Sequence, residues 1–185
     1  MAAGLWAIST PRPDVLVAGD GQAAVVRGSD GRLSVIHSGR DNFAIKEWLA
    51  ADADARAPKD PSLSNGVNCD AIGCVGKLRD GRLVSMALTS EAFAEDCARV
   101  AIVVSQREAP SPNCAATLID RNIWRAYGAV ALRWTGDNFE QSVTLALGYE
   151  RPWTQGPAIA AADEAQPRAS RSDATPRSED LDAGD

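Results

Sequence analysis

The chain has 185 residues, a formal net charge of −6 at pH 7 and hydrophobic side chains at 45% of its positions. Its few lysines (Lys46, Lys59 and Lys77) are scattered, which argues against the clustered basic charge that a strong nonspecific grip on nucleic acid requires. No segment reaches the roughly 18 to 20 apolar residues of a membrane span. The length predicts one domain with its own hydrophobic core.

The two ends of the chain differ in composition from its middle. Residues 1–12 are apolar up to Ser9 but lack the basic leading region of a signal peptide, so we expect a linker or the end of a helix that starts earlier. Residues 154–185 are predicted to be a disordered acidic tail, because from Pro157 on they contain seven carboxylates, three arginines and almost no large apolar side chain. The domain is therefore expected over residues 13–153.

The first predicted elements are strands. Asp14–Ala18 is a short apolar run with β-branched residues. Ala23–Arg27 and Arg32–His37 flank Gly28–Gly31, whose Asp and Gly tolerate the positive φ of a hairpin turn. The sequence therefore predicts a hairpin that is preceded by a third strand.

A helix and a long loop are expected next. Asp41–Ala50 has apolar residues at helical spacing, with Asp41 or Asn42 as its cap. Residues 51–68 contain prolines, a glycine and several charges without periodicity, which indicates a surface loop.

The second half of the chain repeats the sequence of the first turn and is then predicted to alternate strands with helices. The tetrapeptide Asp-Gly-Arg-Leu of Asp30–Leu33 recurs at Asp80–Leu83, as a duplicated hairpin or as a second use of the same turn chemistry. The predicted elements are strands at 73–78 and 82–88, a helix at 89–98 capped by Thr89 or Ser90, a buried strand at 100–105, a strand at 115–119, a short helix from Asp120 to Tyr127, and strands at 129–134 and 142–147. This order predicts an α/β fold with a mixed sheet.

The first hairpin carries a resemblance to a known family. Val17–Gly39, VAGDGQAAVVRGSDGRLSVIHSG, resembles the opening hairpin of the metallo-β-lactamase-like domain at the C-terminal end of the ComEC family of DNA-uptake channel proteins, whose pattern is like LDVGQGDAVLIRTPDGRTLLIDTG. A weaker likeness extends to Trp134, and Cys97–Val104 stands where the family has aDVLKVPHHGS. The resemblance implies a reduced metallo-β-lactamase-like α/β fold, with hairpins, a mixed β-sheet and a few short helices.

The metal ligands that the family uses are missing from this chain. An active domain binds metal through a His-x-His-x-Asp-His motif and later His and Asp ligands, and the metal lowers the pKa of a bound water. Here the single histidine, His37, precedes the corresponding stretch, and Ser105–Glu108 replaces the family's HHGS. The remaining candidate oxygens are those of Asp41, Asp52, Asp54 and Asp60. We therefore expect no metal, no cofactor and no catalytic residues, and a structural role for His37.

Three interpretations of the four cysteines remain open. Two disulfides, Cys69 with Cys74 and Cys97 with Cys114, are compatible with the short first loop and with the position of Cys97 and Cys114 before two predicted strands. A four-cysteine zinc site lacks the paired Cys-x-x-Cys spacing, and four free thiols suit a reducing compartment. The resemblance favours disulfides, because the family's soluble domain faces the outside of the inner membrane.

The resemblance implies a non-catalytic C-terminal domain of a ComEC-like channel protein in competence and transformation. Its expected partners are the membrane channel portion, which would precede residues 1–12, and weakly bound single-stranded DNA; its expected location is the periplasmic side of the inner membrane. Arg121, Trp124, Arg125 and Arg133 are the candidate DNA contacts, since aromatic rings stack on bases, although such aromatic residues are more often part of a core.

Two other functions remain open from the residues. The first is a metal-dependent hydrolase, such as a nuclease, with an atypical carboxylate site built from Asp52, Asp54 or Asp60. The second is a free-standing interaction module that has kept the fold without its chemistry.

Overall fold

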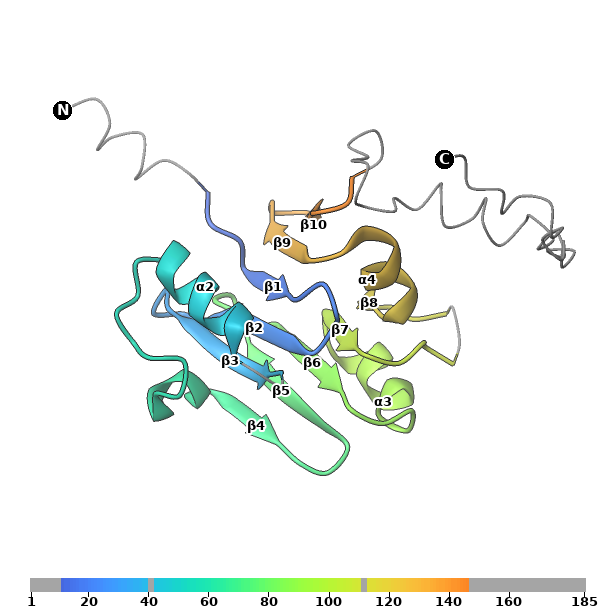
Figure 1. The fold of residues 1–185 in the computed structure, drawn as a ribbon. Helices are drawn as coiled ribbons and strands as arrows, with labels where there is room; N and C mark the ends of the chain where they lie inside the picture. Colours follow the sequence, from blue (N-terminus) through green and yellow to red (C-terminus); the bar gives the residue numbers. More distant parts are fainter. Residues whose placement is uncertain (1–10, 40–41, 111–112, 147–185) are drawn as a thin grey trace, which may run out of the picture.

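The computed structural model describes residues 11–39, 42–110 and 113–146 of the chain. The described residues form a mixed α/β fold with two five-stranded sheets, three short α-helices and one 3-10 helix (Figure 1). The predictions for residues 1–10, for Asp41 and for the tail at 154–185 fall outside the described residues. Within those described ranges, no helix has the length and apolar character that crossing a membrane requires.

The first sheet is antiparallel throughout, with the strand order β10-β9-β1-β2-β3. Its central strand β1 aligns Val15 with Val26 on one side and with Leu132 on the other, so the N-terminal hairpin and the C-terminal hairpin share one sheet. The strands are β1 (Val15–Val17), β2 (Ala23–Arg27), β3 (Leu33–Ser38), β9 (Val130–Trp134) and β10 (Phe139–Val143).

The second sheet, ordered β4-β5-β6-β7-β8, is antiparallel from β4 to β6 and parallel from β6 to β8. A parallel pair needs a crossover connection, and α3 (Ala92–Arg99) supplies it between β6 and β7. The strands are β4 (Val67–Cys69), β5 (Gly73–Lys77), β6 (Leu83–Ala87), β7 (Ile102–Ser105) and β8 (Thr117–Ile119). Strand β7 is buried at every position, as expected for a parallel strand that is covered on both faces.

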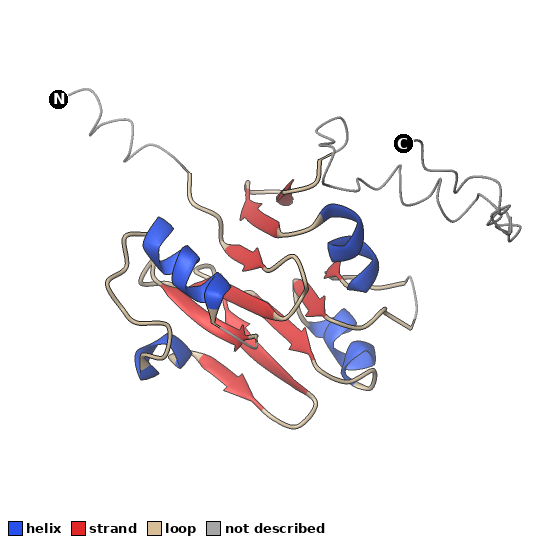
Figure 2. Ribbon diagram, viewed as in Figure 1, coloured by secondary structure: helices blue, strands red, loops and turns tan. Residues whose placement is uncertain are grey.

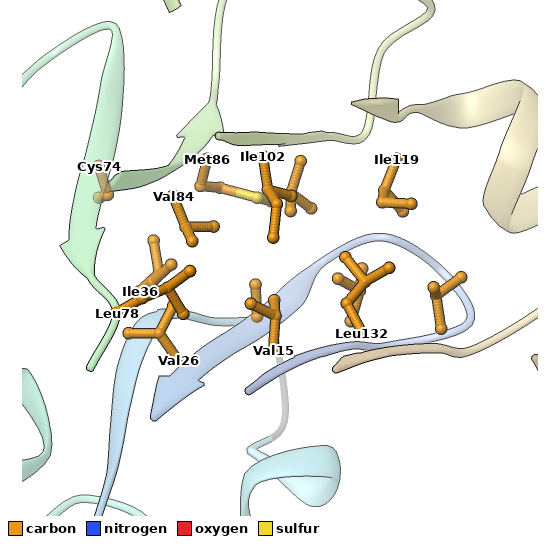
Figure 3. Packing of buried hydrophobic residues seen from close by; sticks show 14 residues of the cluster. Val15, Val26, Ile36, Cys74, Leu78, Val84, Met86, Ile102, Ile119 and Leu132 are labelled. Atoms are coloured by element: carbon orange, nitrogen blue, oxygen red, sulfur yellow. The ribbon is translucent and has the colours of Figure 1, made fainter. Parts of the chain in front are cut away.

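The main core lies between the two sheets, which face each other (Figure 3). Val15 and Leu132 of the first sheet point toward Met86 and Ile102 of the second, and all four side chains are fully buried. Burial of side chains of this size contributes roughly 1.5 to 3 kcal/mol each relative to exposure. This interior therefore holds the two sheets together.

Helices cover the outer faces, so the layers run helix, sheet, sheet, helix (Figure 2). Helix α2 (Phe43–Ala51) buries Ile45 and Leu49 in the same cluster as Val25 of β2. Helix α3 buries Phe93 in a cluster with Val103 of β7. Helix α4 (Arg121–Tyr127) directly follows β8 and lies at the carboxyl end of the parallel strands.

The repeated tetrapeptide builds the same turn twice, and the two turns line one groove. In each turn the Asp carboxylate accepts a hydrogen bond from the Arg N–H two residues later, at 3.0 Å for Asp30 and 3.1 Å for Asp80. The hairpins approach so closely that a Cβ atom on Gly76 would lie 3.1 Å from Cγ2 of Val26. A larger residue at position 76 would therefore need the side chains of Val26 and Ile36 to shift.

The prediction of a loop over residues 51–68 is wrong for the second half of that range, which contains the 3-10 helix η1 (Pro61–Ser64) and strand β4. Strand β4 is mostly exposed and exists through its pairing with β5, a nonlocal contact that no alternating pattern announces. The predicted mixed sheet is present as the second sheet, whereas β1, β9 and β10 form a separate antiparallel sheet with β2 and β3.

Two predicted boundaries are displaced as well. Helix α3 begins at Ala92 rather than near Ser90, because the N–H groups of Leu88 and Thr89 both donate to the carbonyl of Ile72 and hold the chain extended beyond β6. Strand β10 ends at Val143, where the sequence predicted a strand over 142–147.

Candidate functional site

The carboxyl ends of three parallel strands meet at one edge of the second sheet. Ala87 and Ser105, the last residues of β6 and β7, lie side by side, and β8 ends at Ile119 next to them. Ligands in open α/β sheets bind outside the carboxyl ends of the strands, where loops and helix starts converge. This edge is therefore a candidate functional site.

Ser105 and Arg107 fill the end of β7 with internal hydrogen bonds. The fully buried hydroxyl of Ser105 donates to the carbonyl oxygen of Ala87 over 2.8 Å and accepts the N–H of Arg107 over 3.1 Å. The Nε–H of Arg107 donates to the carbonyl oxygen of Leu88 over 3.0 Å. The loop after β7 is thereby fastened to the end of β6.

Helix α4 is fixed at this edge by the buried carboxylate of Asp120. Its Oδ1 accepts the backbone N–H groups of Asn122 and Ile123, which is the hydrogen-bonding expected of a helix N-cap. Its Oδ2 accepts the N–H of Ala109 over 3.0 Å. The predicted capping role of Asp120 is confirmed, and the same side chain also holds the loop that follows β7.

The indole of Trp124 closes the edge between the two sheets. Its Nε1–H donates to the carbonyl oxygen of Ser105 over 3.2 Å, and the side chain is half-buried. The loop between β1 and β2 packs against it so tightly that a Cβ atom on Gly21 would lie 2.5 Å from Nε1 of Trp124. Trp124 therefore contacts both sheets, and its single indole N–H donor is already hydrogen-bonded.

Arg121 and Arg125 lie on the same helix as Trp124, and the backbone of Arg121 is hydrogen-bonded to that of Arg107. We call Arg107, Arg121 and Arg125 together the arginine edge. Arg121 and Arg125 are exposed and lie about one helical turn apart on α4. Arg107 is exposed too, and its carbonyl oxygen accepts the N–H of Arg121 over 3.2 Å. Guanidinium groups at such spacing can bind phosphate groups, and a half-exposed indole can add contact with a base.

The fourth predicted DNA contact, Arg133, lies elsewhere. It is on β9 in the first sheet, where its guanidinium forms an ion pair with Glu140 of β10. A separate aromatic group stands at the end of β9, where Arg82 lies 3.4 Å from the ring centre of Trp134 and 4.7 Å from that of Phe139. This contact joins the second hairpin turn to the first sheet.

The carboxylates that the hydrolase hypothesis needs are engaged by arginines or by a helix end. Asp52 accepts a bidentate pair of bonds from the buried Arg27, at 2.8 and 2.9 Å. Hydrogen bonds from Arg56 hold the pKa of Asp54 well below its usual range. The pKa of Asp60 is lowered too, by the hydrogen bond from Ser62 that caps η1.

The described residues contain no group of three or more His, Cys, Asp or Glu side chains that could hold a metal ion. Asp41, another candidate oxygen, falls outside them. A guanidinium that binds a carboxylate competes with a cation for the same oxygens. The geometry therefore gives the carboxylate hydrolase no specific support.

His37 lies at the end of β3 and is half-buried. Its Nδ1 is 2.6 Å from the carbonyl oxygen of Gln22 and 3.2 Å from the backbone nitrogen of Gly39. The ring thus joins the end of β3 to the start of β2, in keeping with the structural role expected from the sequence.

The four cysteines all lie in described residues and pair as two disulfides. Cys69 and Cys74 are directly opposite each other on β4 and β5. Cys97 of α3 pairs with Cys114, which lies just before β8. The first of the three interpretations is thus the one that the geometry matches.

Reasoning from the sequence placed Arg121, Trp124 and Arg125 together but missed Arg107 as their neighbour. The signal was the buried run of β7 followed by a second strand, because β7 and β8 pair in parallel and bring the residues after each strand to the same edge. Comparison with models of protein families, with curated proteins and with solved structures gives no match.

Proposed function

We propose that this chain is a non-catalytic C-terminal domain of a ComEC-like DNA-uptake protein, with a structural and DNA-guiding role. Its fold would be a reduced metallo-β-lactamase-like fold. Its partners would be the membrane channel portion of such a protein and, weakly, single-stranded DNA. It would work at the inner membrane, on the periplasmic side.

The arrangement of the first hairpin supports the proposed lineage. Gly19–Gln22, the part of the chain that matches the family's GQGD-like segment, forms the loop between β1 and β2. This loop contacts Trp124 at the carboxyl edge, through Gly21. The hairpins, the mixed second sheet and the short helices support the fold that the resemblance implies.

One observation carries the proposal that the domain guides DNA and does not cleave it. Ser105–Glu108 stands where the family has its HHGS ligands, and here Ser105 and Arg107 are held by the carbonyls of Ala87 and Leu88. By the resemblance, Arg107 would place positive charge where the family binds its metal ion. The same charge suits a phosphate group of a DNA strand.

The expected DNA binding is weak and sensitive to salt. The arginine edge offers three cations in a chain whose formal net charge is −6, and the exposed Glu108 lies beside them. Each phosphate contact to a single strand adds about 0.7 to the slope of log K against log salt. Guidance of a passing strand requires contact of this modest strength, because the strand must leave again.

A nuclease assay tests the proposal. Purified protein with added Mn²⁺ or Zn²⁺ is incubated with single-stranded and double-stranded DNA, and we expect both to stay intact. The same mixtures on a native gel should show retention of the single strand at low salt only. Metal-dependent cleavage that persists through further purification would contradict the proposal.

A further inference from the structure

A polar groove of about 610 Å³ lies between the two hairpin turns. It is at the far end of the sandwich from the arginine edge, because β6 starts at the second turn and ends at Ala87 beside Ser105. Three segments line it: the turn at 28–32, the turn at 77–81 and the loop that carries Arg56 and Asn65. The groove is thus made by the repeated turn and has no part in the site described above.

Basic side chains outnumber carboxylates in the lining. The cations are Arg32, Arg56, Lys77 and Arg79, and the carboxylates are Asp30 and Asp80. Lys77 ends strand β5 and Arg79 lies in the turn that follows; both are exposed, whereas Leu78 between them is buried in the core. Neither the Lys77 nor the Arg79 side chain makes a hydrogen bond or an ion pair with the part of the chain that the structure describes.

The carboxylates near the groove already have partners. Asp30 and Asp80 each accept a backbone N–H within their own turn. Asp54, beside the groove, binds Arg56 at 2.5 Å and Arg32 at 3.3 Å. These pairs hold Arg56 in place and leave Lys77, Arg79 and the largely exposed Arg32 with donors to spare.

We infer that this groove binds phosphate oxyanions, carried by the phosphodiester backbone of a single strand or by a free phosphate compound. Ammonium and guanidinium donors from two facing turns can hold oxyanion oxygens from two sides, which is the arrangement that phosphate recognition uses. The exposed Ser29 adds a hydroxyl donor on the first turn. The inference stands independently of the proposed function, because it uses none of the residues of the arginine edge.

Amide chemical shifts of the full chain test the inference, with inorganic pyrophosphate and oligo-dT as the two probes. We expect both turns, residues 28–32 and 77–82, to shift on titration. The variant Lys77→Gln with Arg79→Gln should bind roughly tenfold more weakly, the effect of losing about one net charge-assisted hydrogen bond. The matched control, Lys46→Gln with Lys59→Gln, makes the same charge change outside the groove and should bind within about twofold of the parent.

The two probes separate the sources of the phosphate. Shifts of the turns with oligo-dT alone point to a strand, shifts with pyrophosphate alone to a free phosphate compound, and shifts with both to a site open to either. The absence of turn shifts with both probes at millimolar concentration overturns the inference, as does equal weakening in the groove variant and the control. If oligo-dT shifts only Arg107, Arg121 and Arg125 and pyrophosphate shifts neither turn, the groove inference fails while the proposed function stands.

Discussion

Gly21 shows how one residue couples the two sheets beside the arginine edge. Its φ of 65° lies in the left-handed region, and the indole of Trp124 fills the space where a side chain would begin. The backbone conformation and the lack of space both restrict this position, because the loop between β1 and β2 turns sharply here and also packs against Trp124. The packing of this edge therefore depends on a residue that has no side chain.

Replacing Gly21 by alanine should cost more than the same change elsewhere. Gly31→Ala is the matched control, because Gly31 has a φ of 77° but nothing within 4 Å of an added Cβ. We expect a loss of about 1 kcal/mol for the control, the cost of a left-handed backbone, and a further loss of about 1 to 3 kcal/mol for Gly21→Ala from overpacking. Urea denaturation measures both, and equal losses would argue against the contact with Trp124.

The pH dependence of stability should reflect the ion pairs of the acidic loop. Hydrogen bonds from Arg56 lower the pKa of Asp54 in the folded state. Such a group adds stability above its unfolded pKa of about 3.9, and this stability is lost as the pH falls through and below that value. We therefore expect the free energy of unfolding to decrease between about pH 5 and pH 3.

Asp54→Asn should flatten that decrease without abolishing it. The pKa values of Asp60 and Asp80 are lowered too, by Ser62 and by Arg82, and they keep part of the dependence. Urea midpoints at a series of pH values give the comparison. A variant whose stability falls with pH as steeply as that of the parent would mean that Asp54 is not held by Arg56 in solution.

At the scale of elements, the two disulfides cross-link segments of the second sheet and the helix that covers it. Cys69–Cys74 secures the edge strand β4, and Cys97–Cys114 ties α3 to the chain before β8. Their sequence separations are 5 and 17 residues, for which the chain-entropy model gives stabilisation of about 2 and about 3 kcal/mol. The longer loop should therefore matter more.

Paired alanine variants test this order. Cys97→Ala with Cys114→Ala should lower the free energy of unfolding more than Cys69→Ala with Cys74→Ala, under oxidising conditions. A reducing agent is the control, because it should remove most of the difference between the parent and either variant. Alkylation of the unreduced parent should modify no cysteine, and four modified thiols in its mass spectrum would refute both cross-links.

Elements with a local signal were predictable from the sequence. A few neighbouring residues were enough to predict the turn at Asp30-Gly31, the cap at Asp120 and the buried run of β7. All three are present in the structure. Strand β4 and the start of α3 were not predictable, since they depend on pairing with β5 and on the carbonyl of Ile72. Nonlocal contacts decide such segments, and a window along the chain does not contain them.

At the scale of the whole molecule, the division into two sheets could not be derived from local patterns. Strand β1 is flanked by β2 and by the distant β9, so the register that unites them spans nearly the whole domain. The same long-range order assembles the candidate site, because Arg107 joins Arg121 and Arg125 only through the parallel pairing of β7 with β8. Arg133 lies on the other sheet, because long-range strand pairing places β9 there.

The resulting molecule has two positively charged regions at opposite ends of one sandwich. One is the arginine edge, at the carboxyl ends of β6, β7 and β8, and the other is the groove between the hairpin turns. Several of its described carboxylates, such as Asp52 and Asp54, bind arginines, so an overall negative charge coexists with local cationic surfaces. A scaffold that contacts DNA without hydrolysing it fits this distribution.

Titration of labelled oligo-dT against the parent and against Arg107→Gln, Arg121→Gln and Arg125→Gln combined tests the central claim most directly. The control combines Lys46→Gln, Lys59→Gln and Arg99→Gln, with the same charge change on exposed positions away from the edge. We predict that the parent binds at low salt and that the edge variant binds more weakly, with a salt slope shallower by about 2. No binding by the parent at tens of micromolar, or equal slopes in the edge variant and the parent, would contradict it.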